Sequence, residues 1–141
     1  MKHIRAVSFL SIGVLLLVAC GGGVDEGFTG QWRGNTTVVG GGTSFSYAAT
    51  INLVADGDAL RVSQICPDGS GSIHVPGEGT NLRWGGEFNC PIALASCSTA
   101  RVVYTTANIV LGASGVVISA NGTLSGCGSS LAISSTFTGS K

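Results

Sequence analysis

Cysteines are the residues whose type and spacing most clearly predict chemistry in this chain. The body of the chain contains Cys66, Cys90, Cys97 and Cys127. Four cysteines can form two disulfides in an oxidising compartment, or they can hold a structural zinc ion. The sequence has no CxxC pair, and His74 is the only histidine after His3. We therefore expect two disulfides and no metal site.

The pairing of these cysteines is open, because four cysteines allow three connectivities. We favour a bond between Cys90 and Cys97, which would close the short loop 91–96. The second bond would then join Cys66 to Cys127 and connect two distant strands. The other two connectivities stay open as alternatives.

Acid–base catalysis has little support in the sequence. A Ser-His-Asp triad would have to use His74, and no Gly-x-Ser-x-Gly nucleophile elbow accompanies this histidine. Paired carboxylates could hydrolyse glycosides, but Asp56, Asp58 and Asp68 lie in predicted turns, where Asp accepts backbone hydrogen bonds. We expect a protein that is not an enzyme and that uses no cofactor.

The fifth cysteine, Cys20, ends a segment that is typical of an export signal. Lys2 and Arg5 precede an apolar run over residues 6–19, which is shorter than the roughly 20 residues of a transmembrane helix. The run ends in Leu17-Val18-Ala19-Cys20, which resembles the lipobox of bacterial lipoproteins. The resemblance implies that residues 1–19 are cleaved off and that Cys20 carries acyl chains such as palmitate.

The same resemblance implies a location. Two or three acyl chains hold a protein stably on a membrane, whereas a single chain does so only marginally. The glycine-rich residues 20–27 would be a flexible linker between the lipid and a domain at residues 28–141. In lipoproteins, Asp after the lipidated cysteine favours the inner membrane. Gly21 stands there instead, which implies the outer membrane, or the outer face of the plasma membrane in a one-membrane bacterium.

Cleavage before Cys20 would leave 122 of the 141 residues, enough for one domain with a hydrophobic core. Five Lys or Arg would then face seven Asp or Glu, a formal charge of −2, and these charges are scattered singly. The absence of a basic patch excludes nucleic acid as a partner. The partners we expect are the membrane, through the lipid, and a small ligand or an envelope protein.

Apolar and polar residues alternate with period two through much of residues 28–141, which predicts strands rather than helices. The clearest case places every second residue from Phe45 to Leu53 on one apolar face. Asn121-Gly122 predicts a type I′ hairpin turn. We expect an all-β fold, a small antiparallel up-and-down β-barrel, with a two-sheet β-sandwich as the alternative. About eight strands are predicted, at residues 28–38, 44–53, 60–66, 72–75, 81–89, 101–111, 116–120 and 131–138.

The two tryptophans are the remaining candidates for a role in binding. Gly30-Gln31-Trp32 resembles the Gly-x-Trp opening of the calycin barrels, the lipocalins and avidins, in which the Trp plugs one end of the barrel. In lipocalins an Arg near the chain end packs on this Trp, whereas here only Lys141 follows the last strand. We expect Trp32 to be a core plug. Trp84 is the candidate ligand-binding residue, with a plain core role as the alternative.

Together these observations predict a membrane-anchored lipoprotein whose barrel binds a ligand, or supports an envelope structure, without catalysing a reaction. The alternative is a lipid-anchored inhibitor of lysozyme or of a protease, which would insert residues 21–27 or the 90–97 loop into an active site. A barrel filled by aromatic side chains would exclude a small-ligand carrier and leave the exposed loops as the working surface.

Overall fold

A computed structural model of the chain describes residues 22–141, so the predictions for the signal segment, the lipobox and Cys20 lie outside the described residues. The predicted all-β fold with about eight strands is confirmed. No helix in residues 22–141 is both long and apolar enough to cross a membrane. The elements are a short 3-10 helix, η1 (Glu26–Phe28), and the strands β1 (Gly30–Gly40), β2 (Thr43–Asp56), β3 (Ala59–Ser63), β4 (Ser72–Pro76), β5 (Asn81–Pro91), β6 (Arg101–Gly112), β7 (Gly115–Gly126) and β8 (Ser129–Ser140).

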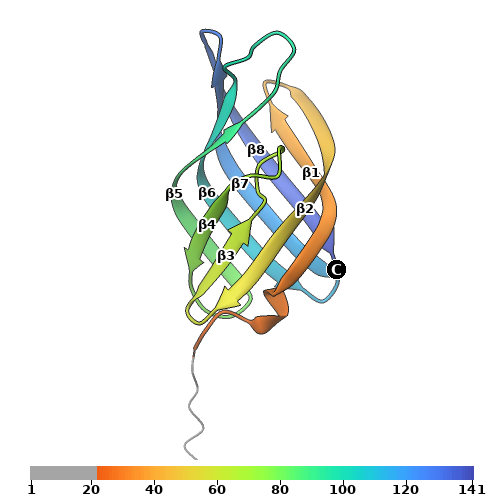
Figure 1. Ribbon diagram of the computed structural model, residues 1–141, viewed down its shortest axis with the longest axis vertical. Coiled ribbons are helices and arrows are strands. Elements are labelled where there is room, and N and C mark those ends of the chain that lie inside the picture. Colours follow the sequence, from red (N-terminus) through yellow and green to blue (C-terminus); the bar gives the residue numbers. More distant parts are fainter. Residues whose placement is uncertain (1–21) are drawn as a thin grey trace, which may run out of the picture.

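The strands form a single antiparallel sheet that curls into a barrel (Figure 1). Their order is β4-β3-β2-β1-β8-β7-β6-β5, so the first strand pairs with the last. The two strands at the ends of this order, β4 and β5, contact each other, but within residues 22–141 no ladder of backbone hydrogen bonds joins them. The predicted up-and-down barrel is therefore confirmed and the sandwich alternative is wrong. The barrel has a seam between β4 and β5.

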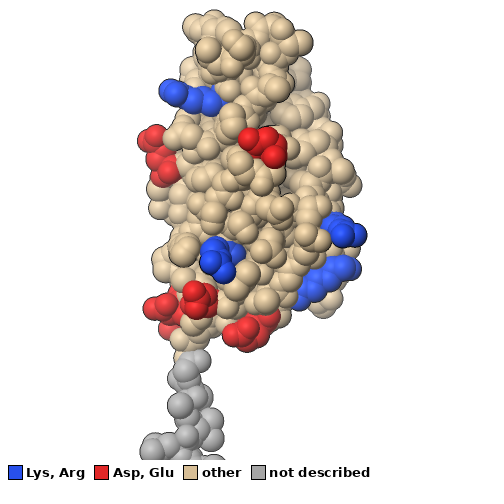
Figure 2. Space-filling model, viewed as in Figure 1, with Lys and Arg blue, Asp and Glu red and all other residues tan. Residues whose placement is uncertain are grey.

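The two ends of the barrel differ. The described chain begins at the lower end in Figure 1, where the β2–β3, β4–β5 and β6–β7 turns also lie. The opposite end, which we call the mouth, carries the β1–β2 turn, the β5–β6 loop and the β7–β8 turn. On the face shown in Figure 2, acidic side chains gather near the lower end, and the tip of the mouth shows no charged side chain. On this face, the tip of the mouth is thus free of charged side chains.

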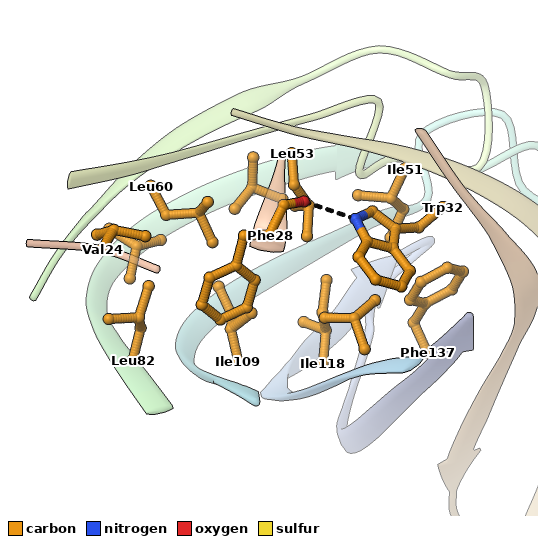
Figure 3. Close-up of a cluster of buried hydrophobic side chains, with 13 residues drawn as sticks. Val24, Phe28, Trp32, Ile51, Leu53, Leu60, Leu82, Ile109, Ile118 and Phe137 are labelled. Atoms are coloured by element: carbon orange, nitrogen blue, oxygen red, sulfur yellow. Dashed lines mark hydrogen bonds between the residues drawn. The ribbon is translucent and has the colours of Figure 1, made fainter. Parts of the chain in front are cut away.

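Inward-facing side chains fill the lower half of the barrel (Figure 3). Trp32 of β1 lies in this core beside Phe28 of η1, and its indole Nε1 donates a 2.8 Å hydrogen bond to the Phe28 carbonyl oxygen. Trp32 is only 5 % exposed, so it is the core plug that we predicted. The buried residues that pack around this pair include Leu53, Leu60, Val75, Leu82, Ile109, Val116, Ile118 and Phe137.

The disulfides join Cys66 to Cys90 and Cys97 to Cys127. Two disulfides are therefore confirmed, whereas the favoured pairing of Cys90 with Cys97 and of Cys66 with Cys127 is wrong. The first bond links the β3–β4 loop to the end of β5, across the seam. The second links the β5–β6 loop to the β7–β8 turn. The first bond joins segments that only the closed barrel brings together, whereas the second lies just beyond the paired ends of β6 and β7.

The predicted hairpin turn at Asn121-Gly122 is also wrong. Both residues lie inside β7, which pairs with β6 and with β8 along this stretch. The turn lies instead at Cys127 and Gly128, whose φ angles of 48° and 80° both fall in the left-handed region. The turn preference of Asn-Gly is overridden because both residues pair with β6 on one side and with β8 on the other. On the β6 side, an irregularity between Tyr104 and Thr106 shifts the register by one residue.

β3 is shorter than predicted, because it ends at Ser63 rather than at Cys66. Gln64 has a φ of 63°, and its N–H donates a 2.9 Å hydrogen bond to the Gly71 carbonyl oxygen. These features turn the chain away from the neighbouring strand. As a result, β3 pairs only with residues 52–56 of β2. Among the described residues, no strand lies beside residues 43–51 on that edge of β2.

Candidate binding groove at the barrel mouth

Trp84, the predicted ligand-binding candidate, lines a small cavity inside the barrel. Phe88 from the same strand, Tyr47 from β2 and Tyr104 from β6 are among the other lining residues. The cavity has a volume of about 50 Å³. An apolar cavity that binds benzene measures about 150 Å³. The aromatic side chains therefore leave too little room for a ligand of that size, which argues against a small-ligand carrier.

Four side chains with hydroxyl groups line the same cavity: Thr36, Tyr47, Tyr104 and Ser135. Burial raises the pKa of Tyr47, the nearby Tyr104 raises it further, and a hydrogen bond with Thr36 opposes both effects. Burial also raises the pKa of Tyr104, against a hydrogen bond with Ser135. Both phenols therefore stay protonated at neutral pH and form part of a polar belt within the apolar interior.

A larger hollow opens at the mouth, and we call it the mouth groove. Its volume is about 470 Å³, within the range of about 300–1,000 Å³ that is common for ligand sites. Phe45 is 50 % exposed and Leu94 is 41 % exposed. Large apolar side chains gathered in an exposed hollow mark an interaction site. The groove is lined by Phe45, Tyr47, Pro67, Asp68, Pro91, Ile92, Ala93 and Leu94.

The fold holds each wall of the mouth groove in place. One wall is β2, whose upper half pairs with β1 through backbone hydrogen bonds. This wall carries the stacked rings of Phe45 and Tyr47, whose centroids lie 6.3 Å apart. The first disulfide ties the β3–β4 loop, with Pro67 and Asp68, to the end of β5. The second disulfide ties the β5–β6 loop to the β7–β8 turn. A groove held in this way is preorganised, which lowers the entropic cost of binding.

Asp68 is the only charged residue among those that line the mouth groove. Its Oδ1 accepts hydrogen bonds from the Ser70 hydroxyl and, at 2.9 Å, from the Ser70 N–H. These bonds hold the pKa of the Asp68 carboxyl below its ordinary value. The groove is therefore apolar along most of its length and carries one negative charge at neutral pH.

The other residues considered for chemistry do not come together. His74 is exposed on β4, and Asp56 and Asp58 lie at the β2–β3 turn, at the lower end of the barrel. In the part of the chain that the structure describes, no three His, Cys, Asp or Glu residues are grouped so that they could hold a metal ion. These residues therefore contribute nothing to the mouth groove.

Lys141 packs against the plug at the lower end. Its Nζ lies 4.8 Å from the Trp32 ring centroid and donates a 2.8 Å hydrogen bond to the Gly27 carbonyl oxygen. An ammonium group at this distance from an indole ring forms a cation–π contact. The contact places the Lys141 ammonium over the Trp32 ring. The resemblance of Gly30-Gln31-Trp32 to the calycins stays a prediction.

Sequence reasoning missed the mouth groove. The strand pattern placed Phe45 on an inward face, but this side chain lies beyond the end of β3 and is half exposed. The signals present in the sequence were Pro67 and Pro91, each directly after a cysteine and each a groove residue. They could not reveal the site because its walls come from three separate segments of the chain.

Comparisons with known protein families, curated proteins and solved structures find no significant match for this chain. The functional argument therefore rests on the geometry of the barrel and on the residues of the mouth groove.

Proposed function

We propose that this chain is a lipid-anchored lipoprotein of the bacterial cell envelope and that its barrel is a non-catalytic binding module. The mouth groove is the binding surface. The observation that carries the proposal is an apolar hollow of about 470 Å³ with half-exposed Phe45 and Leu94, in a barrel whose interior keeps only about 50 Å³. The larger free space, with the exposed side chains of Phe45 and Leu94, thus lies at the mouth and not in the interior.

The position of the groove fits a membrane-anchored protein. Cys20, the proposed lipid site, precedes the described chain, which begins at the lower end of the barrel (Figure 1). The mouth groove lies at the opposite end, so a partner would meet it on the side away from the membrane. Two disulfides agree with an oxidising space outside the cytoplasm.

The same geometry favours a module that receives a segment of a partner over an inhibitor that inserts its own. Val24 is buried, and Asp25 caps η1 by accepting a hydrogen bond from the Gly27 N–H, so this part of the N-terminal arm packs on the barrel. The loop after Cys90 forms a wall of a hollow. Neither feature is a free arm.

An apolar fluorescent probe tests the proposed surface. Every strand and both disulfides lie within residues 22–141, so a soluble chain of these residues keeps the whole barrel. We expect the uncharged dye N-phenyl-1-naphthylamine to bind this chain saturably and Phe45→Ser and Leu94→Ser each to weaken the binding. Val117→Ser is the matched control, because Val117 is also exposed (38 %) but lies on β7, outside the groove. Equal loss in all three variants, or no saturable binding, would refute the proposed surface.

A further inference from the structure

The upper part of β2 is an open strand edge beside the mouth groove. β2 pairs with β1 from Thr43 to Leu53, but β3 covers its other edge only over residues 52–56. Phe45 and Tyr47, which line the groove, lie within the part of β2 that β3 leaves uncovered. A strand edge of this kind presents unpaired N–H and C=O groups, which are a template for another extended chain.

This edge lacks the features that normally block strand addition. Residues 43–51 contain neither a charged residue nor a proline, and charges and prolines are the usual guards of an exposed edge. The edges at the seam are guarded: β4 ends at Pro76, and β5 carries a bulge after Gly85, then Glu87 and Pro91. The contrast singles out the upper edge of β2 as the one suited to receive a chain.

The shape of the site selects an extended peptide rather than a second barrel. β2 forms one side of the groove, and Pro91 to Leu94 form the other, with the Pro67–Asp68 corner between them. A hollow with walls on both sides admits a single strand, whereas the edge of another barrel would meet the opposite wall. The described N-terminal residues of this chain cannot reach the groove, because Val24 is held at the lower end. Its N–H donates a hydrogen bond to the Gly57 carbonyl oxygen, and it forms an isolated β-bridge with Gly79.

The charge of the groove further restricts the class of peptide that it can bind. The groove wall has seven uncharged residues and one anion, Asp68, which is fully exposed at its rim. An acidic peptide would be repelled by this charge, and a lysine or arginine on the bound chain would be attracted to it. One exposed ion pair contributes little to affinity. The charge of Asp68 therefore sets a preference for basic peptides but does not supply most of the binding free energy.

We infer that the mouth groove captures an extended segment of a partner protein as an added strand on β2, antiparallel or parallel to residues 43–47. Alternate apolar side chains of the segment pack on Phe45, Tyr47 and Leu94, and a basic residue lies beside Asp68. Strand addition derives affinity from main-chain hydrogen bonds and specificity from the pockets for alternate side chains. The inference rests on the proposed binding function and adds the class of partner.

The test uses the soluble chain of residues 22–141 and a fluorescent seven-residue peptide of alternating valine and threonine that ends in lysine. Its matched partner has N-methyl groups on the amides that would face β2, so the side chains remain and the donors are lost. We expect saturable binding of the first peptide and at least about tenfold weaker binding of the second. The loss of two backbone hydrogen bonds accounts for an affinity decrease of about this size. Equal affinities would overturn strand addition.

Charge is tested in the same assay. Replacing the peptide's lysine by glutamate should weaken binding about twofold to fivefold at low salt, as for an exposed ion pair. Asp68→Asn should abolish this difference, while Asp56→Asn, at the opposite end of the barrel, should preserve it. A difference that persists in Asp68→Asn would contradict the placement of the basic residue.

Two further outcomes separate this inference from the proposed function. If the apolar probe binds in the groove but no peptide does, strand capture is wrong while the binding surface stands. If sedimentation shows a concentration-dependent dimer that Phe45→Lys abolishes, the occupant of the β2 edge is a second copy of this chain and the inference is overturned. Circular dichroism of each variant shows whether the barrel has folded.

Discussion

Tyr47 links the two hollows of the barrel, because it lines both the interior cavity and the mouth groove. Its ring therefore lies between the interior cavity, of about 50 Å³, and the mouth groove, of about 470 Å³. Tyr104 lines only the interior side. At the residue scale, the hydroxyl of Tyr47 is held by Thr36 while its ring stacks with Phe45, so one side chain serves both the core and the binding surface.

The two tyrosines predict how stability depends on pH. Burial raises the pKa of both phenols above 10.0 in the folded protein. Their contribution to the free energy of unfolding is then constant below pH 10 and decreases above it, because the unfolded chain ionises first. Tyr47 and Tyr104 are the only tyrosines in the sequence, so absorbance at the tyrosinate band reports on them alone. Titration of both at the ordinary value, in the folded protein, would contradict their burial.

At the scale of the elements, the alternation of apolar and polar residues predicted about eight strands and an all-β fold, and it favoured the barrel while leaving a two-sheet sandwich as the alternative. Alternation could not predict where strands stop, because stops depend on single backbone angles such as that of Gln64. Two disulfides were predicted from the cysteine count, but their pairing was not, since Cys66 and Cys90 meet only across the closed seam. The early end of β3 creates the open edge of β2, so the candidate site depends on the feature that sequence reasoning missed.

Gly122 tests the corrected course of β7. A side chain on Gly122 would lie against the Val103 carbonyl oxygen of β6, because the two strands approach closely there. We expect Gly122→Ala to lower the free energy of unfolding by about 1–3 kcal/mol, the usual cost of overpacking. Gly85→Ala is the control, because that position has open space around it. Urea denaturation measures both, and equal effects would speak against the close approach.

The disulfides should support both stability and the groove. They close loops with sequence separations of 24 and 30 residues, for which loop entropy predicts about 3–4 kcal/mol each. We expect replacement of Cys66 and Cys90 by serine to lower the free energy of unfolding by about this amount and to weaken probe binding, because Pro67 and Asp68 lose their tie to β5. A non-reducing digest that links Cys90 to Cys97 would contradict the pairing.

At the scale of the whole molecule, the proposed anchor and the proposed binding surface lie at opposite ends of a rigid barrel. Lipidation of Cys20 remains a prediction from the lipobox resemblance, and the barrel is complete without that residue. We expect Cys20→Ser to lose labelled fatty acid in cells and to leave the membrane fraction or accumulate as the uncleaved precursor. The matched control Cys127→Ser keeps the label. Labelled fatty acid on the Cys20→Ser protein would disprove the anchor.

The central claim is that the mouth groove, and not the barrel interior, is the binding surface. The most direct measurement is an NMR titration of isotope-labelled residues 22–141 with the uncharged dye N-phenyl-1-naphthylamine, read as amide shifts along the chain. The account predicts shifts confined to the segments that line the groove, residues 43–47, 67–68 and 91–94. Shifts centred on Trp84, Ile118 and Phe137 would place the ligand inside the barrel and contradict it.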